Sequence, residues 1–322
     1  MKRNIVLIGI IVTASLLSVM AYIITQGTYA PVAKDTPTSG RVLTKEELSF
    51  PLGFQIPSPS FTGQAFMNNL ITKDDIYNFP QTNNITFAPG AHSSWHRHGG
   101  MILLVTGGVG IYQEEGKKAQ IIREGDVLQI PAGVRHWHGA VKDSWFSQIV
   151  IYDKDWQGEN NPNEDNSLTD EYYNRLELEE YSGHVADKGD FMFPVFKDAF
   201  NLPSFNGPMY MANLYEEDNV AGSPALHEVG FEAGVINQWH IHEGGQILIA
   251  TNGIGYHQIE GQPVQVMHPG DVALCPPGVK HWHGAAAGGR FAHLAANTNP
   301  EKTGLQWFDF ISKEEYDTLP KE

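Results

Sequence analysis

The chain has 322 residues, of which 41% are hydrophobic and 18% charged, a composition that supports a sizeable core and excludes a disordered chain. Its 33 glycines and 19 prolines favour many turns over long helices. The formal charge of −16 argues against nucleic acid as a partner, and the single cysteine, Cys275, excludes an intrachain disulfide and cysteine-based zinc modules.

The N-terminus predicts export. Lys2 and Arg3 precede an almost wholly apolar run, Ile5 to Ile24, which is the pattern of a secretory signal or of an anchoring helix. The run is longer than a typical signal core, and Pro31 disfavours cleavage just before it, so we favour an uncleaved anchor over a cleaved signal. Either alternative places the rest of the chain outside the cytoplasm, membrane-anchored or secreted, with residues 1–36 as signal or anchor plus tether.

The remainder of the chain consists of one sequence module that is repeated. Phe61 to Leu70 reappears as Phe205 to Leu214, at an offset of 144 residues, and the later glycines of the module repeat at an offset of 145. A repeat of this length indicates a duplicated domain and not a solenoid unit. We therefore expect two domains at residues 45–155 and 203–310, a linker with a helix at 156–202, and a C-terminal helix at 311–322.

Within each copy, the segments between glycines and prolines have the patterns of short strands. Four runs in the first copy are apolar or alternating: Met101 to Thr106, Val109 to Gln113, Asp126 to Ile130 and Trp145 to Tyr152. A helix is expected around Asp170 to Glu180, and Ser312 and Glu315 have capping-box spacing at the start of a final helix. Many short strands with glycine-rich turns predict an all-β sandwich or closed barrel.

The second copy carries two His-x-His pairs on predicted strands. His240 and His242 lie two residues apart, as do His281 and His283, so each pair projects to one side of its strand. Gln246 follows four residues after His242, across a Gly-Gly turn, and can bring an oxygen to the same point. Three imidazoles and one oxygen suit zinc, iron, manganese, nickel or copper.

The spacing of these residues resembles the cupin signature. The second copy has the glycines, the His-x-His pair and the Pro-x-Gly-x-x-His ending of that signature at every spacing. It departs from the family in having Gln246 where a glutamate is usual and Ala285 where many members have asparagine. The resemblance spans both repeats and implies a bicupin, which is two tandem double-stranded β-helix (jelly-roll) barrels in one chain.

The residues around the histidines are most similar to a narrower group, the manganese-type cupin hydroxynitrile lyases and the cupins found with carboxymuconolactone decarboxylases. This resemblance implies a divalent metal, manganese before iron, zinc or nickel. The ligands that it implies are His240, His242, Gln246 and His281. It also implies that His283 and His293 line the pocket without binding metal. A histidine held near the metal, His283 or His293, would then be the catalytic acid–base residue.

The first copy is an altered version of the same pattern. His96, His98 and His136 keep their places, but Met101 stands at the position of the glutamine, and the turn before it is one residue shorter. A thioether is a poor ligand for hard manganese or ferrous iron. Three histidines could still hold zinc or copper, with His92 as an extra group. We therefore expect a second, weaker metal site in this copy.

The ligand set of the second copy favours one kind of chemistry. Four neutral ligands leave a divalent ion its full charge, so the ion is a strong Lewis acid and is harder to oxidise than one with a carboxylate ligand. With a histidine to move the proton, this predicts a metal-dependent lyase or isomerase acting on a small oxygenated molecule.

Two other functions stay open, a cupin dioxygenase that uses ferrous iron and oxygen and a non-catalytic cupin that binds a metal or a small molecule. For partners, we expect a small-molecule substrate and, if the N-terminal segment is not cleaved, a membrane. Assembly into a homo-oligomer is left open.

Overall fold

The computed structural model describes residues 41–57, 59–157, 161–165, 168–185 and 188–320. The apolar N-terminal segment that predicts a signal or an anchor lies outside these residues. Among the helices of the described ranges, none is long and apolar enough to cross a membrane. The described chain is mostly β-strand and turn, with a 3-10 helix at Lys45–Glu47 and two short α-helices, α2 at Asp170–Asn174 and α3 at Lys313–Asp317.

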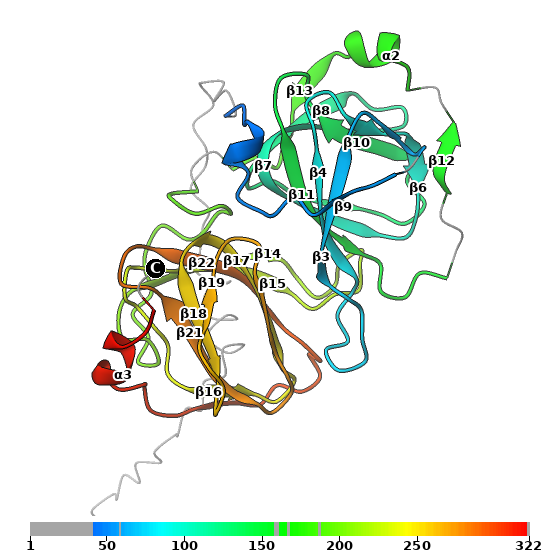
Figure 1. The fold of residues 1–322 in the computed structure, drawn as a ribbon. Helices are drawn as coiled ribbons and strands as arrows, with labels where there is room; N and C mark the ends of the chain where they lie inside the picture. The colour runs from blue at the N-terminus through cyan, green and yellow to red at the C-terminus, as the bar shows by residue number, and fades with distance from the viewer. Residues whose placement is uncertain (1–40, 58, 158–160, 166–167, 186–187, 321–322) are drawn as a thin grey trace, which may run out of the picture.

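The first half of the chain forms one β-barrel, drawn in blue to green in Figure 1. Its strands are β1 Phe54–Gln55, β2 Phe61–Thr62, β3 Ala65–Ile71, β4 Thr82–Phe87, β5 His92–Ser93, β6 Trp95–Arg97, β7 Met101–Glu114, β8 Ala119–Arg123, β9 Val127–Ile130, β10 His136–Ala140, β11 Phe146–Tyr152, β12 Asn161–Asp165 and β13 Leu178–Glu180. The long strand β7 belongs to both walls. Its first part pairs with β11 and β9, and its last part pairs with β10 and β8.

The second half forms a second β-barrel of two five-stranded sheets, drawn in yellow to orange in Figure 1. Its strands are β14 Met209–Tyr215, β15 Leu226–Phe231, β16 His240–His242, β17 Gln246–Gly253, β18 Gly255–Ile259, β19 Gln265–Met267, β20 Val272–Cys275, β21 Lys280–Ala285, β22 Phe291–Asn297 and β23 Leu305–Trp307. The sheet orders are β14-β15-β22-β17-β20 and β19-β18-β21-β16-β23. The all-β prediction with two barrels is therefore confirmed.

The predicted strands of the first copy are present, but two of them are joined. Met101 to Thr106 and Val109 to Gln113 are parts of the single strand β7, which bends at Gly108. Gly108 has a φ of +75°, and a Cβ there would lie 1.8 Å from the carbonyl oxygen of Trp145. Only glycine fits this bend without strain, so the turn expected from the glycine pair is a kink within one strand.

The predicted helices are shorter than expected. Thr169 caps α2 by accepting a hydrogen bond from the backbone of Tyr172, and the helix ends at Asn174. The prediction of helix as far as Glu180 is wrong, because Leu178–Glu180 is strand β13, which pairs in parallel with β8. At the C-terminus, Ser312 caps α3 as its spacing predicts, and the helix covers Lys313–Asp317 only.

The two barrels pack against each other through an apolar cluster that both contribute to. Equivalent positions of the two copies meet in it, at an offset of 145 residues. The first barrel contributes Ile102, Leu104, Ile149 and Ile151, and the second contributes Ile247, Ile249, Leu294 and Ala296. Meeting of equivalent positions is the arrangement that a two-fold-related pair of domains produces.

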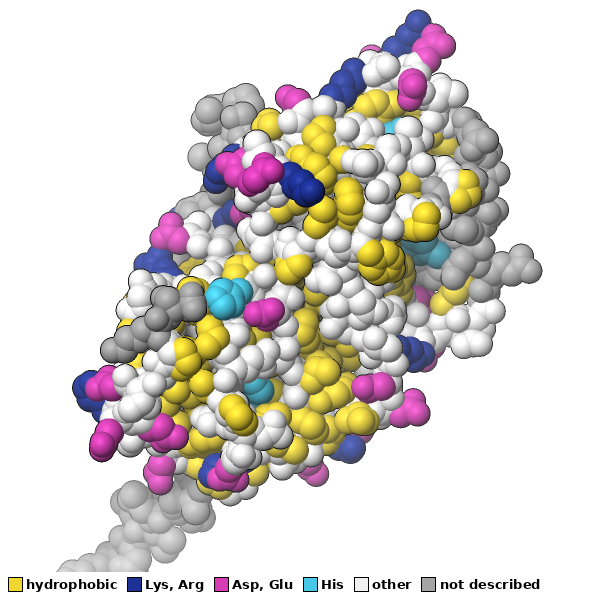
Figure 2. Space-filling view, in the orientation of Figure 1, with side chains coloured by type: hydrophobic (Ala, Val, Ile, Leu, Met, Phe, Trp, Pro, Cys, Tyr) yellow, Lys and Arg dark blue, Asp and Glu magenta, His cyan; other side chains and the backbone are white. Residues whose placement is uncertain are grey.

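On the surface, Figure 2 shows the Lys and Arg side chains of one face scattered singly, without gathering into a basic patch.

The two barrels also meet next to their histidine loops. In the first barrel, Gly100 follows the His-x-His pair, and a Cβ there would lie 1.7 Å from the carbonyl oxygen of Val220 in the second barrel. In the second barrel, Asn299 donates hydrogen bonds to the carbonyl oxygens of Gly244, at 2.8 Å, and of Ile76 in the first barrel, at 2.9 Å. The second barrel therefore contacts the histidine loop of the first directly, and the first barrel reaches that of the second through Asn299.

Candidate metal centres

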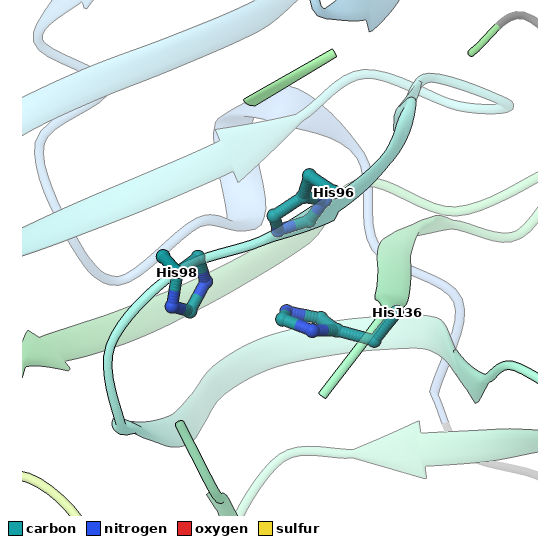
Figure 3. A group of neighbouring side chains, drawn as sticks. All are labelled: His96, His98 and His136. Atoms are coloured by element: carbon teal, nitrogen blue, oxygen red, sulfur yellow. The ribbon is translucent and has the colours of Figure 1, made fainter. Parts of the chain in front are cut away.

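The first barrel brings together the three histidines that its sequence predicts. His96 lies on β6, His98 follows that strand, and His136 begins β10 directly opposite His96. The ligand nitrogens of the three side chains lie within 4.8 Å of one another, and the ring centroids are 4.3 to 5.3 Å apart. Figure 3 shows the rings of His96, His98 and His136 gathered around a common space.

Backbone carbonyls fix the orientation of these rings. His96 Nδ1 donates to the carbonyl two residues before it at 2.8 Å, His136 Nδ1 does the same at 2.9 Å, and His98 Nδ1 donates to the next residue at 2.6 Å. A neutral imidazole has one N–H, so each ring carries its lone pair on Nε2. His136 Nε2 is buried without a hydrogen-bond partner. A buried lone pair of this kind costs free energy unless an ion binds it, so the residues fit a metal.

Burial keeps this cluster in the neutral form that metals require. Desolvation lowers the pKa of His136 well below its usual value, and the neighbouring histidines His96, His138 and His98 lower it further. Burial also lowers the pKa of His98. The rings of His136 and His98 are therefore uncharged near neutral pH and present lone pairs instead of protons.

A cavity of about 370 Å³ lies beside these histidines. His96, His98, Met101 and His138 form part of its wall. The rest is mostly apolar and aromatic and includes Ile56, Phe61, Met67, Ile85, Tyr152 and Trp156. A largely apolar cavity with a few polar groups at one end suits a small organic molecule.

The second barrel brings together the four side chains that its sequence predicts as ligands. His240 on β16 lies opposite His281 on β21, with ring centroids 4.1 Å apart, and the ring of His242 is 5.1 Å from that of His240. Gln246 begins β17, and its Oε1 lies 3.1 Å from His281 Nε2. All four side chains are buried.

The contact between Gln246 and His281 joins two hydrogen-bond acceptors. His281 Nδ1 donates to the carbonyl oxygen of Val279 at 3.1 Å, so the neutral ring has no proton on Nε2. The amide of Gln246 donates to Asn297 Oδ1 at 3.2 Å, which turns its oxygen toward His281. Burial lowers the pKa of His281 to about 4, so protonation of the ring does not resolve the contact near neutral pH. Two acceptors held together in this way fit a cation bound by both.

The structure places His283 nearer to this cluster than the sequence predicts. The ligand nitrogens of His240, His281 and His283 lie within 4.8 Å of one another. His242 is outside this tighter group, although its ring lies beside His240, and its buried Nε2 has no hydrogen-bond partner. Either His242 or His283 is therefore close enough to complete a set of histidine ligands.

The two predicted acid–base residues of the second barrel are in contact. His293 Nε2 lies 3.2 Å from His283 Nδ1, and His293 Nδ1 donates to the carbonyl oxygen of Leu294. His293 Nε2 therefore accepts a hydrogen bond from the Nδ1–H of His283. The lone pair of His283 is then on Nε2, which accepts a hydrogen bond from the Asn237 amide at 3.0 Å. Burial lowers the pKa of His293 to about 4. The pair is a buried, oriented chain of hydrogen bonds.

In the first barrel the corresponding pair has the opposite proton arrangement. Gln148 takes the place of His293, and its Nε2 donates to His138 Nδ1 at 2.9 Å. The proton of the His138 ring is therefore on Nε2, the atom that carries the lone pair in His283.

His92, which the sequence suggests as an extra ligand, does not join the cluster of His96, His98 and His136. Its ring instead stacks on Tyr173, with centroids 5.1 Å apart.

Sequence reasoning missed one histidine of the second barrel. His257 on β18 lies opposite His283, and its Nε2 is 3.0 Å from the sulfur of Cys275. Cys275 is fully buried opposite Gln246, and burial raises the pKa of its thiol, as expected for a strand residue that is not a nucleophile. Only the strand register reveals this pair, since a lone His257 in the sequence has no partner at motif spacing.

Comparisons with known proteins agree with this geometry. Residues 83–152 and 227–294, one segment in each barrel, match the cupin domain family Cupin_2. The (R)-mandelonitrile lyase of Granulicella tundricola is 39% identical over 115 residues, which are 35% of this chain and 85% of that protein.

Two solved structures are also similar. A cupin-like protein from Thermotoga maritima has 37% identity and a TM-score of 0.33, over 35% of this chain and 84% of its own. Vicilin from hazelnut, Corylus avellana, has 13% identity and a TM-score of 0.50, over 81% of this chain and 89% of its own. At this identity, the likeness to vicilin concerns the fold alone.

Proposed function

The chain belongs to the cupin superfamily, and from this premise we propose that it is a metal-dependent lyase that acts on a small oxygenated molecule in the second barrel. The observation that carries the proposal is the pair of buried acceptors, Gln246 Oε1 and His281 Nε2, held 3.1 Å apart. The similarity to (R)-mandelonitrile lyase supports the reaction type.

We propose that His240, His242, Gln246 and His281 hold the metal, with manganese first and iron, zinc or nickel as alternatives. Neutral nitrogen and oxygen ligands suit all four ions. When bound, such an ion supplies Lewis-acid polarisation of a substrate oxygen. Because the four side chains are neutral, none of its charge is cancelled by the protein.

The histidine pair supplies the proton transfer. In our proposal, the substrate hydroxyl replaces the Asn237 amide at His283 Nε2 and gives its proton to that atom. The Nδ1 proton of His283 moves toward His293, which is anchored through its own Nδ1. As the C=O bond forms, the bond to the leaving carbon breaks and the leaving group takes the electron pair. General acid–base catalysis of this kind contributes about 10²- to 10⁴-fold to the rate.

The test uses the purified chain, its metal content and its turnover, with (R)-mandelonitrile as the first substrate because of the similarity to the lyase. We expect His240→Ala to lose the metal of the second barrel and its turnover. We expect His283→Ala and His293→Ala to lose turnover while the metal content stays unchanged. His268→Ala, at a half-exposed histidine on the surface, is the control and should change neither.

The same assays separate the alternatives. Oxygen consumption in step with product formation would assign the protein to the cupin dioxygenases. Intact metal binding without turnover across small hydroxy and carbonyl substrates would instead favour a binding protein.

We also propose that the chain is exported and works outside the cytoplasm, as its N-terminal sequence predicts. Cell fractionation of the full-length chain tests this proposal. Recovery in the membrane or in the extracytoplasmic fraction is expected, and full-length protein in the cytoplasmic fraction would contradict it.

A further inference from the structure

The two histidine clusters differ at the position where a fourth side chain enters the barrel. Met101 begins β7 and lies opposite Ile130 on β9, while Gln246 begins β17 and lies opposite Cys275 on β20. The two residues therefore occupy equivalent places in equivalent strands. One barrel offers a thioether sulfur there, and the other offers an amide oxygen.

The side chain of Met101 faces the same space as the histidines. It is 2% exposed, it packs with Leu103 and Val105 in the apolar cluster of the first barrel, and it lines the cavity together with His96 and His98. The thioether and these two imidazoles therefore border one space. His136 Nε2 is buried without a hydrogen-bond partner, so its lone pair is available to an ion in this space.

The side chains that would hold an ion here, three imidazoles and a thioether, are neutral. The carboxylate that lines the cavity is Asp153, and backbone N–H groups occupy its oxygens: Gly100 donates to Oδ2 at 3.1 Å and Asp155 donates to Oδ1 at 2.9 Å. Because the cost of removing an ion from water rises steeply with its charge, a largely apolar cavity penalises a doubly charged ion more than a singly charged one.

We propose that the first barrel is a Cu(I) site formed by His96, His98, His136 and Met101. Soft sulfur ligands select Cu(I), and imidazole suits copper as well, whereas hard divalent ions prefer oxygen. The chain then carries a soft-metal site in one barrel and a hard-metal site in the other. This assignment does not depend on the lyase activity proposed for the second barrel, because it concerns different residues and is measured by binding alone.

The experiment titrates the full chain with Cu(I) under argon with ascorbate, in competition with bicinchoninate. One tight Cu(I) is expected, lost in His96→Ala and kept in His240→Ala. Met101→Leu, which conserves volume and so protects the fold, should weaken Cu(I) binding about tenfold or more and leave Zn(II) binding nearly unchanged. Gln246→Met is the reciprocal variant and should give the second barrel a new affinity for Cu(I).

X-ray absorption provides a direct readout of the sulfur. A copper–sulfur distance should appear in the copper-loaded chain and disappear in Met101→Leu, while thermal unfolding shows that this variant is folded. Equal Cu(I) affinity in the parent and in Met101→Leu would overturn the proposal. So would tight Cu(I) that is lost in His240→Ala but kept in His96→Ala, because Cys275 and its neighbours would then be the ligands.

Discussion

The two barrels hold three histidines in nearly the same way and surround them with different chemistry. In both, strand pairing sets one histidine opposite another, and backbone carbonyls fix the rings through Nδ1. The neighbours differ at four equivalent positions. The first barrel has Met101, Tyr112, Ile130 and Gln148, and the second has Gln246, His257, Cys275 and His293. In our proposals, the duplicated framework therefore sets where an ion would bind, and the neighbouring residues set which ion it would be and whether a proton can move.

The largest effect is expected from removing a histidine from either cluster. His281→Ala should weaken metal binding in the second barrel by at least about a hundredfold, because it takes away both a ligand and the partner of Gln246. His136→Ala should do the same in the first barrel only. Metal stoichiometry per chain measures both effects. If either variant emptied both barrels, the two sites would not be independent.

A large effect is also expected from replacing His293, the hydrogen-bond partner of His283. His293→Gln gives the second barrel the residue of the first, and it should lower turnover about a hundredfold while bound metal is unchanged. The physical reason is that an amide can orient His283 but cannot receive a proton from it. Steady-state kinetics with metal analysis checks this, and full turnover in the variant would remove His293 from the mechanism.

A third difference concerns the outer face of each barrel. Glu228 is fully buried and accepts from Thr251 at 2.9 Å, while the equivalent Asn84 accepts from Thr106 at 3.2 Å. Burial raises the pKa of Glu228 to about 8, although Lys188 lies near enough to oppose this. The folded chain therefore keeps a proton that the unfolded chain loses above pH 4.5.

The free energy of unfolding should then fall as the pH rises from about 4.5 to about 8, because the folded state binds the extra proton throughout this range. Glu228→Gln should remove that slope and stabilise the chain at pH 8 by about 2–4 kcal/mol. Urea unfolding at pH 5 and pH 8 tests this. Parallel pH profiles for parent and variant would show that Glu228 is ionised in the fold.

The smallest effect is expected at the contact between the barrels. Asn299→Ala removes the two hydrogen bonds to Ile76 and Gly244 and should cost about 1 kcal/mol of stability. Because Gly244 belongs to the histidine loop of the second barrel, metal there should also dissociate faster, while metal in the first barrel should not. Metal release to a chelator measures the difference, and equal rates in parent and variant would separate this contact from the site.

The sequence predicts the features that depend on spacing along the chain. The repeat predicts two barrels, and the alternation of His240 with His242 and of His281 with His283 predicts their clustering. Features that depend on strand register are not predictable in this way. The contact of His257 with Cys275 requires knowing which residues lie opposite each other.

Features that depend on segments distant in the chain also cannot be predicted from the local sequence pattern. Leu178–Glu180 is a strand because the edge of β8 is there to pair with it, and its local sequence alone favours helix continuation. Likewise, the charge state of Glu228 follows from what covers it, since desolvation by the surrounding protein is the main cause of its raised pKa.

The crossed contacts at the histidine loops have a consequence for the history of the chain. A duplicated domain is ordinarily redundant, so one copy can be lost when the other performs the work. Here the backbone of Val220 in the second copy lies against Gly100 in the first, and Asn299 in the second copy donates a hydrogen bond to the carbonyl oxygen of Ile76 in the first. The two copies therefore support each other structurally. Deleting either copy would expose the shared apolar cluster and remove a contact next to a histidine loop of the remaining one. The backbone of each barrel is consequently needed by the other, whichever residues line its own interior.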